Sequence, residues 1–199
     1  MIVAIILAAG ESRRMGQPKA LLPIDGTTFI GKIVKVLQNA AIARTMVVLG
    51  HNAKEMQNHV RHLPVDIVIN EGYKMGQLSS LTAAIREIQA SSYADKVDGV
   101  LVHLVDHPYL NADLIKVMIE KFYATKKRIV VPRYHGRRGH PVLFSRSLFG
   151  ELLAAPLEQG AKSVVHGHRE ETLEVDTEEE GITIDIDTPD SYKKYVPGD

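Results

Sequence analysis

The residues best suited to chemistry lie in a short loop near the start of the chain. Residues 10–18 follow an apolar run of nine residues and contain Gly10, Arg14 and Gly16 before Lys19. Glycines let backbone N–H groups approach a ligand closely, and cations beside them attract phosphate. The loop matches neither the Walker A pattern nor the dinucleotide-binding glycine pattern, which argues against kinase, GTPase and dinucleotide functions. The spacing favours anion binding; an ordinary strand–helix connection with solvated charges is the alternative.

Carboxylates beside apolar segments supply a second kind of chemistry. Asp106 follows the apolar residues 99–105, and Asp185 and Asp187 alternate within the sequence IDIDTP near the end of the chain. Their oxygens are the ligands that Mg²⁺ prefers in proteins. Alternation along a strand would point both of the later carboxylates to one face. Ordinary structural roles remain open, because Asp106 can be a turn residue and Asp187 or Thr188 can cap the helix that follows.

Alternating strands and helices must position these residues. Apolar runs rich in β-branched residues predict strands, and helical spacing of apolar residues predicts helices. The predicted strands are residues 2–7, 45–49, 66–69, 99–105, 129–132, 141–145, 172–175 and 182–186. The predicted helices are residues 27–41, 52–62, 78–88, 111–122, 146–154 and 161–167, with a last one from residue 189. This alternation predicts an α/β fold, a three-layer α/β/α sandwich with a Rossmann-like, mostly parallel sheet.

The carboxyl ends of parallel strands are the edge at which such sheets bind ligands. We therefore expect the loops after Leu7, Ile69, Val105 and Val131 to lie on one edge of the sheet. This arrangement would bring Asp106 next to the first loop, although the two are far apart in the sequence.

Composition limits the classes of function that the chain can have. Its 24 basic and 24 acidic residues balance, so no overall charge favours nucleic acid or a membrane surface. The lack of cysteine excludes disulfides and thiolate metal sites and fits a cytoplasmic location. The first apolar run has no basic residues before it, unlike a signal peptide, and is too short to span a bilayer. Without repeats or linkers, residues 1–199 are expected to form a single domain.

One long pattern in the first loop resembles a known family. The matching residues are Leu7-Ala8-Ala9-Gly10-x-Ser12-x-Arg14-Met15-Gly16-x-x-Lys19. They resemble the signature of the nucleotidyltransferases with a MobA-like fold, whose glycine-containing loop binds a nucleoside triphosphate. Ala9 makes the chain most similar to the molybdenum cofactor cytidylyltransferases of the MocA or PucB type, because the guanylyltransferase relatives typically have glycine there. The resemblance spans essentially the whole chain.

The resemblance implies a role for each candidate residue. The nucleotide would contact Leu7, Ala8, Ala9, Gly10, Arg14, Gly16, Lys19, Asn70, Gly76 and Ser80. The catalytic residues would be Arg14, Lys19 and Asp106. Mg²⁺ would be held by Asp106 and Asp187, with Asp185 as the second choice. His140 and Arg138 would bind the acceptor. The alternatives are ordinary helix capping for Ser80 and a solvated loop position for Arg138.

The activity implied by the resemblance is Mg²⁺-dependent transfer of CMP from CTP to molybdopterin, with release of pyrophosphate. One alternative is a nucleotidyltransferase that uses GTP, or that acts on a sugar, polyol or choline phosphate. Another is a non-catalytic chaperone that carries the finished cofactor. A molybdenum hydroxylase, such as xanthine dehydrogenase, is the expected recipient of the finished cofactor, and neither a nucleic acid nor a membrane is an expected partner. The nine histidines match no metal-binding spacing, and a functional role is expected for His140 alone.

Overall fold

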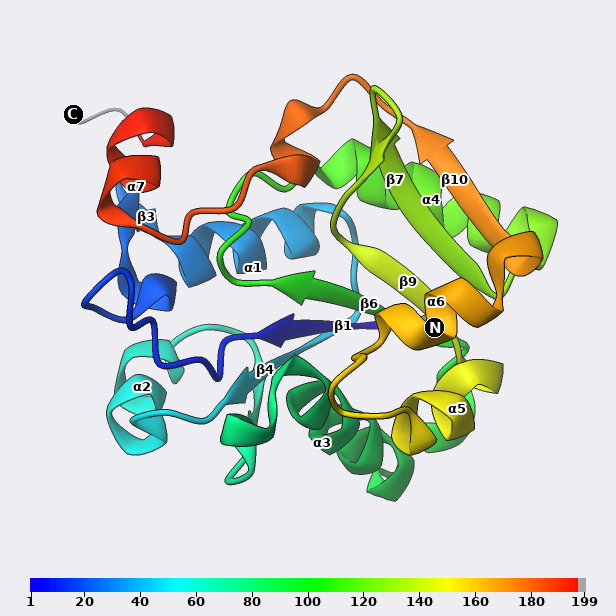
Figure 1. Cartoon of the computed structure of the whole chain (residues 1–199). Helices are drawn as coiled ribbons and strands as arrows, with labels where there is room; N and C mark the ends of the chain where they lie inside the picture. The colour runs from blue at the N-terminus through cyan, green and yellow to red at the C-terminus, as the bar shows by residue number, and fades with distance from the viewer. Residues whose placement is uncertain (197–199) are drawn as a thin grey trace.

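A central sheet of eight strands organises the molecule, which a computed structural model describes for residues 1–196 (Figure 1). Its strands are β1 (Ile2–Leu7), β4 (Arg44–Leu49), β5 (Asp66–Ile69), β6 (Gly99–Leu104), β7 (Ile129–Tyr134), β8 (Arg137–Arg138), β9 (Val142–Ser145) and β10 (Thr172–Asp176). The order is β10-β7-β9-β6-β1-β4-β5, with β8 paired to β7. Strand β9 is antiparallel to β6 and β7, β8 is antiparallel to β7, and the other neighbours are parallel. The expected mostly parallel sheet is confirmed.

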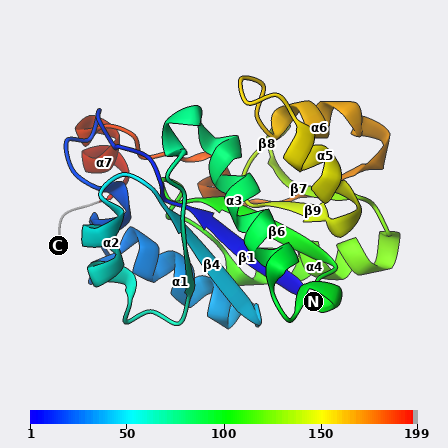
Figure 2. The same ribbon diagram turned by 90° about the horizontal axis from the view of Figure 1, so that it is seen from below.

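Helices cover both faces of this sheet (Figure 2). One face packs against α1 (Phe29–Asn39), α2 (Ala53–Val60) and α4 (Ala112–Thr125). The other packs against α3 (Gln77–Ala90), α5 (Phe149–Ala154) and α6 (Lys162–Gly167). All six residues of β1 are buried, as expected for a central strand with both faces covered. The three-layer sandwich is therefore confirmed.

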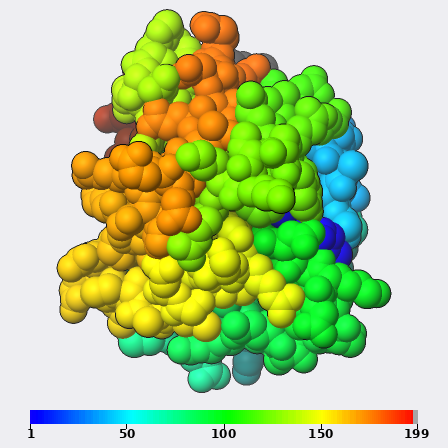
Figure 3. Space-filling model, turned by 90° about the vertical axis from the view of Figure 1, so that its right-hand side faces the viewer, coloured from blue at the N-terminus to red at the C-terminus, as the bar shows by residue number. Residues whose placement is uncertain are grey.

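Short elements complete the described part of the chain. Single turns of 3₁₀ helix occupy Lys19–Leu21, Tyr73–Met75, Ala94–Lys96, Arg146–Leu148, Arg169–Glu171 and Glu180–Thr183. Figure 3 shows that the segments containing α5, α6 and β10, coloured yellow to orange, form a continuous surface on one side of the molecule. Among residues 1–196, none of the helices is both long and apolar enough to cross a bilayer.

The end of the chain packs against its beginning. Helix α7 (Pro189–Tyr195) lies beside the hairpin of β2 (Pro23–Ile24) and β3 (Thr27–Thr28), as Figure 1 shows in red and blue. Apolar side chains of these elements and of the segments beside them form a separate cluster. Its buried members are Met15, Leu22, Ile24, Phe29, Ile186 and Val196, and Tyr192 and Tyr195 of α7 pack against them. The Tyr192 hydroxyl donates a hydrogen bond to the Pro23 carbonyl at 2.6 Å. This contact brings the segment before α7 to the first loop.

The strand expected at residues 182–186 is wrong. The segment is a 3₁₀ turn followed by irregular extended chain. Its backbone groups find partners outside any strand ladder, since the Ile186 N–H donates to the Asp106 carbonyl at 2.8 Å and the Ile182 carbonyl accepts from His140 at 3.0 Å. Both isoleucines are buried, which explains the apolar pattern. Asp185 is exposed, whereas the half-buried Asp187 reaches the first loop, so strand alternation does not relate the two carboxylates.

Residues 133–139, which the strands predicted at residues 129–132 and 141–145 imply to be a loop, form a β-hairpin instead. Strand β7 continues to Tyr134 and β8 pairs back onto it. His135 and Gly136 both have positive φ, 44° and 80°, which suits the two-residue turns that join twisted antiparallel strands. Arg138, the expected acceptor-binding arginine, therefore lies on strand β8 beside Arg137 and opposite Arg133 of β7.

Candidate nucleotide and metal site

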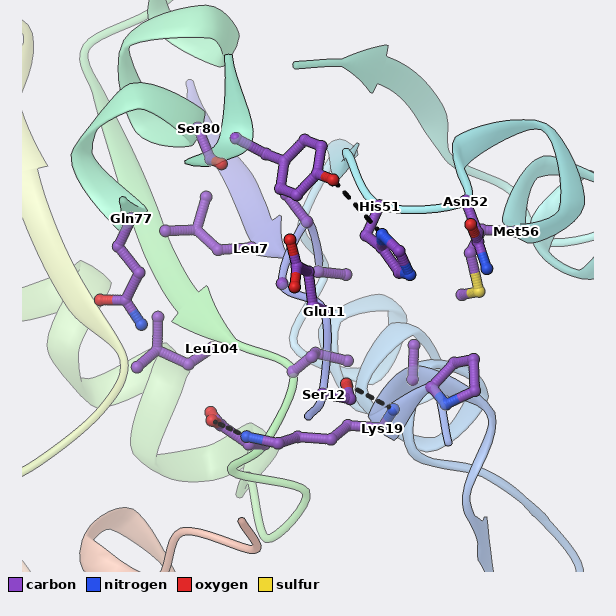
Figure 4. A pocket seen from close by; sticks show the side chains of 18 of the residues that line it. Leu7, Glu11, Ser12, Lys19, His51, Asn52, Met56, Gln77, Ser80 and Leu104 are labelled. Carbon is purple, nitrogen blue, oxygen red and sulfur yellow. Dashed lines mark hydrogen bonds and ion pairs between the residues drawn. The ribbon is translucent and has the colours of Figure 1, made fainter. Parts of the chain in front are cut away.

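A cavity of about 370 Å³ opens at the carboxyl ends of β1, β4 and β6 (Figure 4). Most residues expected there from the sequence line it, namely Leu7, Ala8, Ala9, Gly10, Arg14, Lys19, Gly76, Ser80, Asp106 and Asp187. Gly16, Asn70 and Asp185 are not among its lining residues. The carboxyl edge of the sheet thus brings together three segments that are distant in the sequence: the first loop, the chain around Asp106 and the chain around Asp187.

Ser12 organises the first loop. Its φ of 52° is left-handed, and its carbonyl accepts hydrogen bonds from the N–H groups of Met15 and Gly16, each at 3.0 Å. Its hydroxyl accepts from the Lys19 N–H at 3.1 Å (Figure 4). Met15 anchors the loop because its side chain is buried in the cluster beneath α7. Gly16 has a φ of 77°, so it supplies a turn that other residues rarely adopt.

The backbone of this loop faces open space. Within residues 1–196, the N–H groups of residues 10–14 donate to no protein acceptor. A Cβ placed on Gly10 would meet no atom within 4 Å, so a ligand can approach the chain there. Successive unpaired N–H groups in a turn form a concave site for an anion. The loop therefore has the geometry to hold phosphate oxygens.

Lys19 joins the two acidic residues of the cavity. Its Nζ donates to Asp106 Oδ2 at 2.9 Å and also to Asp187 Oδ1, and Arg14 donates to Asp187 Oδ2. Burial favours a raised pKa for the Asp106 carboxyl, but the charge and hydrogen bond of Lys19 hold that pKa below its ordinary value. Asp106 is therefore ionised near neutral pH, and the cations Lys19 and Arg14 pair with the two carboxylates.

The acidic pair has the donor set for a divalent cation. Asp106 Oδ1 is buried and has no hydrogen-bond partner in the described chain, an arrangement that a bound cation would satisfy. Two carboxylates bridged by one ammonium group are close enough to share an ion. Residues 1–196 contain no cluster of three or more acidic or histidine side chains arranged for a metal. Further ligands would thus come from phosphate and water, as Mg²⁺ sites commonly use.

Local structure positions these carboxylates separately. Strand β6 ends at Leu104, and the Val105 N–H continues its hydrogen bonding by donating to the Leu7 carbonyl at 3.2 Å. Asp106 is the next residue. Thr188, and not Asp187, caps α7: its hydroxyl accepts from the Ser191 N–H at 3.2 Å. The capping box leaves the Asp187 carboxylate available to the cavity. The motif can therefore cap α7 through Thr188 and still offer the Asp187 carboxylate to a metal ion.

Asn70 braces the loop that leads into α3. Its amide donates to the hydroxyls of Ser79 and Ser80 at 2.8 and 3.0 Å, and its carbonyl oxygen accepts from Gly72 at 3.0 Å. Asn70 is 7% exposed, and both its amide nitrogen and its amide oxygen are hydrogen-bonded to protein. Asn70 therefore holds this loop against α3, while Gly76 and Ser80 line the cavity itself.

Several lining residues were absent from the sequence-based prediction. These are His51, Asn52 and Met56, which follow β4, and Tyr73, whose hydroxyl shares a hydrogen bond with His51 Nδ1 at 3.3 Å (Figure 4). The rule that ligands bind at the carboxyl ends of strands would have found them, had it also been applied to the loop after Leu49. Gly50 before them leaves no room for a side chain, because its Cβ would lie 2.5 Å from Tyr73.

A second cavity of about 820 Å³ adjoins the first along Leu7, Gln77 and Leu104, which line both. In Figure 4, Gln77 and Leu104 lie on the same side of the first cavity. His140 and Arg138 line the second cavity and not the first. The predicted acceptor residues are therefore next to the predicted nucleotide residues, across a shared wall.

Three histidines, of which only His140 lines either cavity, form a cluster that their sequence spacing did not indicate. The rings of His103, His107 and His140 have centroids 5.0 to 6.4 Å apart. Burial, then the charge of His140, lowers the pKa of His103 to about 3. Burial, then the charge of His107, lowers the pKa of His140 to about 4. Both rings are therefore neutral at pH 7, and the Nδ1 atoms of all three are buried without a partner in the described chain.

Gly139 explains how His140 reaches this position. A Cβ on Gly139 would lie 2.3 Å from the Ile182 carbonyl oxygen, so only glycine permits the two segments to touch. The His140 N–H then donates to that carbonyl at 3.0 Å.

Comparison with known proteins agrees with this geometry. Residues 4–173 match the family model described as the MobA-like NTP transferase domain. The chain is 28% identical to the molybdenum cofactor cytidylyltransferase of Escherichia coli, over 96% of this chain and 93% of that protein. It is 30% identical to a probable molybdenum cofactor guanylyltransferase of Bacillus cytotoxicus, over 69% of this chain and 64% of that protein.

Solved structures show the same fold. The crystal structure of Rv0371c from Mycobacterium tuberculosis superposes with a TM-score of 0.80 at 30% identity, covering 99% of this chain and 97% of that one. A structure of the same protein in complex with manganese has a TM-score of 0.77 at 28% identity, covering 100% and 99%. With its loop and acidic pair on one cavity, this chain belongs to the MobA-like NTP transferase family and is a nucleotidyltransferase.

Proposed function

We propose that this protein transfers CMP from CTP to the phosphate of molybdopterin, with Mg²⁺, and releases pyrophosphate. The observation that carries the proposal is the meeting of the first loop with Asp106 and Asp187 on one cavity. An anion-binding backbone and a carboxylate pair are the two parts that transfer from a nucleoside triphosphate requires.

The chain's own residues would first bind the triphosphate. Phosphate oxygens would accept hydrogen bonds from the unpaired N–H groups of residues 10–14. Arg14 and Lys19, which are paired with carboxylates in this structure, would turn to the phosphates. Their departure would leave Asp106 and Asp187 as the ligands of Mg²⁺. When bound, Mg²⁺ would neutralise negative charge on the phosphate oxygens during transfer.

The transfer step is a substitution at the α-phosphorus. An oxygen of the acceptor phosphate forms a bond to this phosphorus, and the bond from it to the bridging oxygen of the β-phosphate breaks. Pyrophosphate leaves with the bonding electron pair. No side chain needs to remove a proton, because a phosphate monoester is largely ionised at neutral pH. The contribution of Arg14 and Lys19 is alignment and neutralisation of the charge that develops on pyrophosphate.

We propose CTP and molybdopterin as the substrates because the chain is similar to proteins named for them. Ala9 is the residue by which the chain resembles the cytidylyltransferases. The Escherichia coli relative is named a cytidylyltransferase, and its similarity to this chain extends over 93% of its length. The Bacillus cytotoxicus relative, a probable guanylyltransferase, supports GTP as the alternative donor. The large cavity beside the nucleotide site favours an acceptor of considerable size over choline phosphate.

Pyrophosphate release tests the proposal directly. The purified protein with Mg²⁺ would be given CTP, GTP or UTP, each with and without molybdopterin. We expect release only with CTP and molybdopterin together, with the cytosine dinucleotide as product. A preference for GTP would overturn the base assignment. Release with a sugar, polyol or choline phosphate in place of molybdopterin would overturn the acceptor. Tight binding of the finished cofactor without any release would identify a carrier.

A further inference from the structure

The two cavities meet along a wall made of three side chains. The residues that line both cavities are Leu7, Gln77 and Leu104. Leucine side chains neither donate nor accept hydrogen bonds. Within residues 1–196, Gln77 is therefore the one polar side chain that a molecule in either cavity can contact. Figure 4 shows it extending from the start of α3 into the first cavity, with its amide group beside Leu104.

Transfer of a nucleotide requires the two substrates to meet at this wall. The α-phosphorus would lie in the first cavity with the triphosphate, whereas the body of the acceptor would occupy the second, larger cavity. An attacking oxygen must lie about 3–3.5 Å from the phosphorus before the bond forms. The acceptor phosphate must therefore pass from the second cavity into the first, next to Gln77.

The Gln77 amide is available for this contact. The residue is exposed, and its side chain makes no hydrogen bond with residues 1–196. It is the first residue of α3, but no side chain caps this helix, and the N-cap residue is Gly76. Neither helix capping nor pairing within the protein accounts for a glutamine at this position.

The backbone that carries Gln77 is held in place on both sides. The Ser79 hydroxyl donates to the Gly76 carbonyl at 2.7 Å, and the Asn70 amide donates to the same hydroxyl at 2.8 Å. Leu78 is 2% exposed and belongs to the core between α3 and the sheet. A side chain on such a braced turn can hold a substrate in a defined orientation.

A neutral donor suits the wall better than a charged one. Lys19 and Arg14 already pair with the two carboxylates of the first cavity, so a further cation there would compete for them. A carboxylate at position 77 would repel both phosphates. The glutamine Nε2 atom has two N–H groups, and phosphate oxygens accept strong hydrogen bonds from such donors.

The acceptor residues expected from the sequence do not lie on this wall. Arg138 and His140 line the second cavity but not the first. The Arg138 guanidinium also donates to Glu174 Oε1 at 2.7 Å, so its charge is already paired. A contact with both reacting phosphates therefore has to come from another residue.

We infer that Gln77 contacts the reacting phosphates, because its side-chain amide can donate one hydrogen bond to the acceptor phosphate and one to the α-phosphate where the cavities join. These bonds hold the attacking oxygen in line with the α-phosphorus. Both form only when the two substrates are bound together, so Gln77 contributes mainly to the rate of transfer. The inference rests on the proposed function for the roles of the two cavities, but not for the identity of the base or the acceptor.

Kinetics and nucleotide binding of three variants test the inference, with the nucleotide and acceptor that the wild-type protein uses best. Gln77→Met keeps the length of the side chain and removes its hydrogen bonds, so kcat should fall about tenfold or more. The Kd of the nucleotide, measured by isothermal titration without acceptor, should change less than about twofold. Gln77→Glu should lower kcat further, because it places an anion beside two phosphates.

Gln89→Met is the matched control. Gln89 is an exposed glutamine in the last turn of the same helix and lines neither cavity, so its substitution should leave kcat and Kd unchanged. An unchanged kcat in Gln77→Met would overturn the inference, as would a higher kcat in Gln77→Glu than in Gln77→Met. A loss of nucleotide affinity as large as the loss in kcat would also overturn it, because Gln77 would then serve the nucleotide alone.

The same experiment separates this inference from the proposed function. If the wild-type protein uses another nucleotide or another phosphorylated acceptor, the proposed substrates are wrong, and the variants still decide the role of Gln77 with the pair that is used. If the wild-type protein transfers no nucleotide to any acceptor, both the proposed function and the inference are refuted.

Discussion

Lys19 is the residue on which the charge balance of the site depends. Its ammonium lies between Asp106 and Asp187, where a divalent cation would also be attracted. Its side chain is only 14% exposed, so water screens these pairings weakly. Under the proposed function, Lys19 and the metal ion would therefore compete for the same two carboxylates, and a bound triphosphate would relieve this competition by offering Lys19 another partner.

The competition predicts opposite effects of one substitution. Lys19→Met should tighten Mn²⁺ binding to the nucleotide-free protein several-fold, because a competing cation is gone. The same variant should weaken CTP binding about tenfold or more, as a charge-assisted contact is lost. Isothermal titration measures both, with Lys35→Met, an exposed lysine on α1, as the control. Weaker Mn²⁺ binding in Lys19→Met would contradict the account.

Asp106 gives the corresponding prediction for turnover. Asp106→Asn keeps the shape of the side chain and removes its charge, so pyrophosphate release should fall by a factor of about 100 or more. The residue is at the sheet edge and not in the core, so the thermal midpoint should change little. Asp113→Asn, an exposed carboxylate on α4, is the control. Near wild-type turnover in Asp106→Asn would show that the metal assignment is wrong.

At the scale of elements, the loop between β5 and α3 depends on Asn70. The resemblance assigns this residue to nucleotide contact, whereas the hydrogen bonds make it a brace between the loop and the helix. Both roles predict a raised KM for CTP on substitution. Stability distinguishes them, because only a brace contributes to the folded state without nucleotide.

We expect Asn70→Ala to lower the free energy of unfolding by about 1–3 kcal/mol, the cost of leaving buried polar groups without partners. Urea denaturation without nucleotide measures it, and Glu71→Ala, at the exposed neighbouring position, is the control. A raised KM with unchanged stability would favour direct nucleotide contact.

Patterns within single elements were predictable from the sequence, whereas contacts between distant segments were not. The apolar run of β1 is a local feature, and the structure confirms the buried strand that it predicts. Residues 182–186 show the limit of such patterns. Ile182 is buried in the cluster that contains α1 and α4, and Ile186 is buried in the cluster beside α7. Burial without a strand partner therefore produced a strand-like pattern.

The site as a whole follows the same division. The edge-of-sheet rule predicted that Asp106 lies beside the first loop, because the rule depends only on strand direction. The position of Asp187 depends on α7 docking onto the hairpin of β2 and β3, more than 160 residues away, and no local pattern encodes that contact. The ion pair between Arg138 and Glu174 also joins distant segments, so no local pattern predicts it.

At the scale of the whole molecule, buried histidines make stability depend on pH. His103 has a pKa of about 3 in the folded protein and an ordinary value of 6.5 when unfolded. Between these values the unfolded chain binds more protons, so stability is lost as the pH falls below about 6.5. His168 acts in the opposite direction, because hydrogen bonds to Glu151 and then Glu171 raise its pKa.

Lowering the pH from 7 to 5 should therefore cost about 2 kcal/mol of unfolding free energy through His103 alone. Urea denaturation at the two pH values measures the loss, and His103→Gln should show a smaller one because glutamine does not titrate. An equal loss in the variant would mean that His103 is not the responsible group. Holding ionic strength constant keeps the surface pairs of His168 comparable between conditions.

The central claim is that the first loop and two distant carboxylates form a single site for nucleotide and metal. A crystal structure of the protein with Mn²⁺ and a non-hydrolysable CTP analogue tests it most directly, since manganese is located by its anomalous scattering. The account predicts one manganese peak at Asp106 and Asp187, the triphosphate on the backbone of residues 10–14, and Lys19 turned from the carboxylates to a phosphate. A triphosphate bound elsewhere, or Lys19 still bridging both carboxylates beside bound nucleotide, would contradict it.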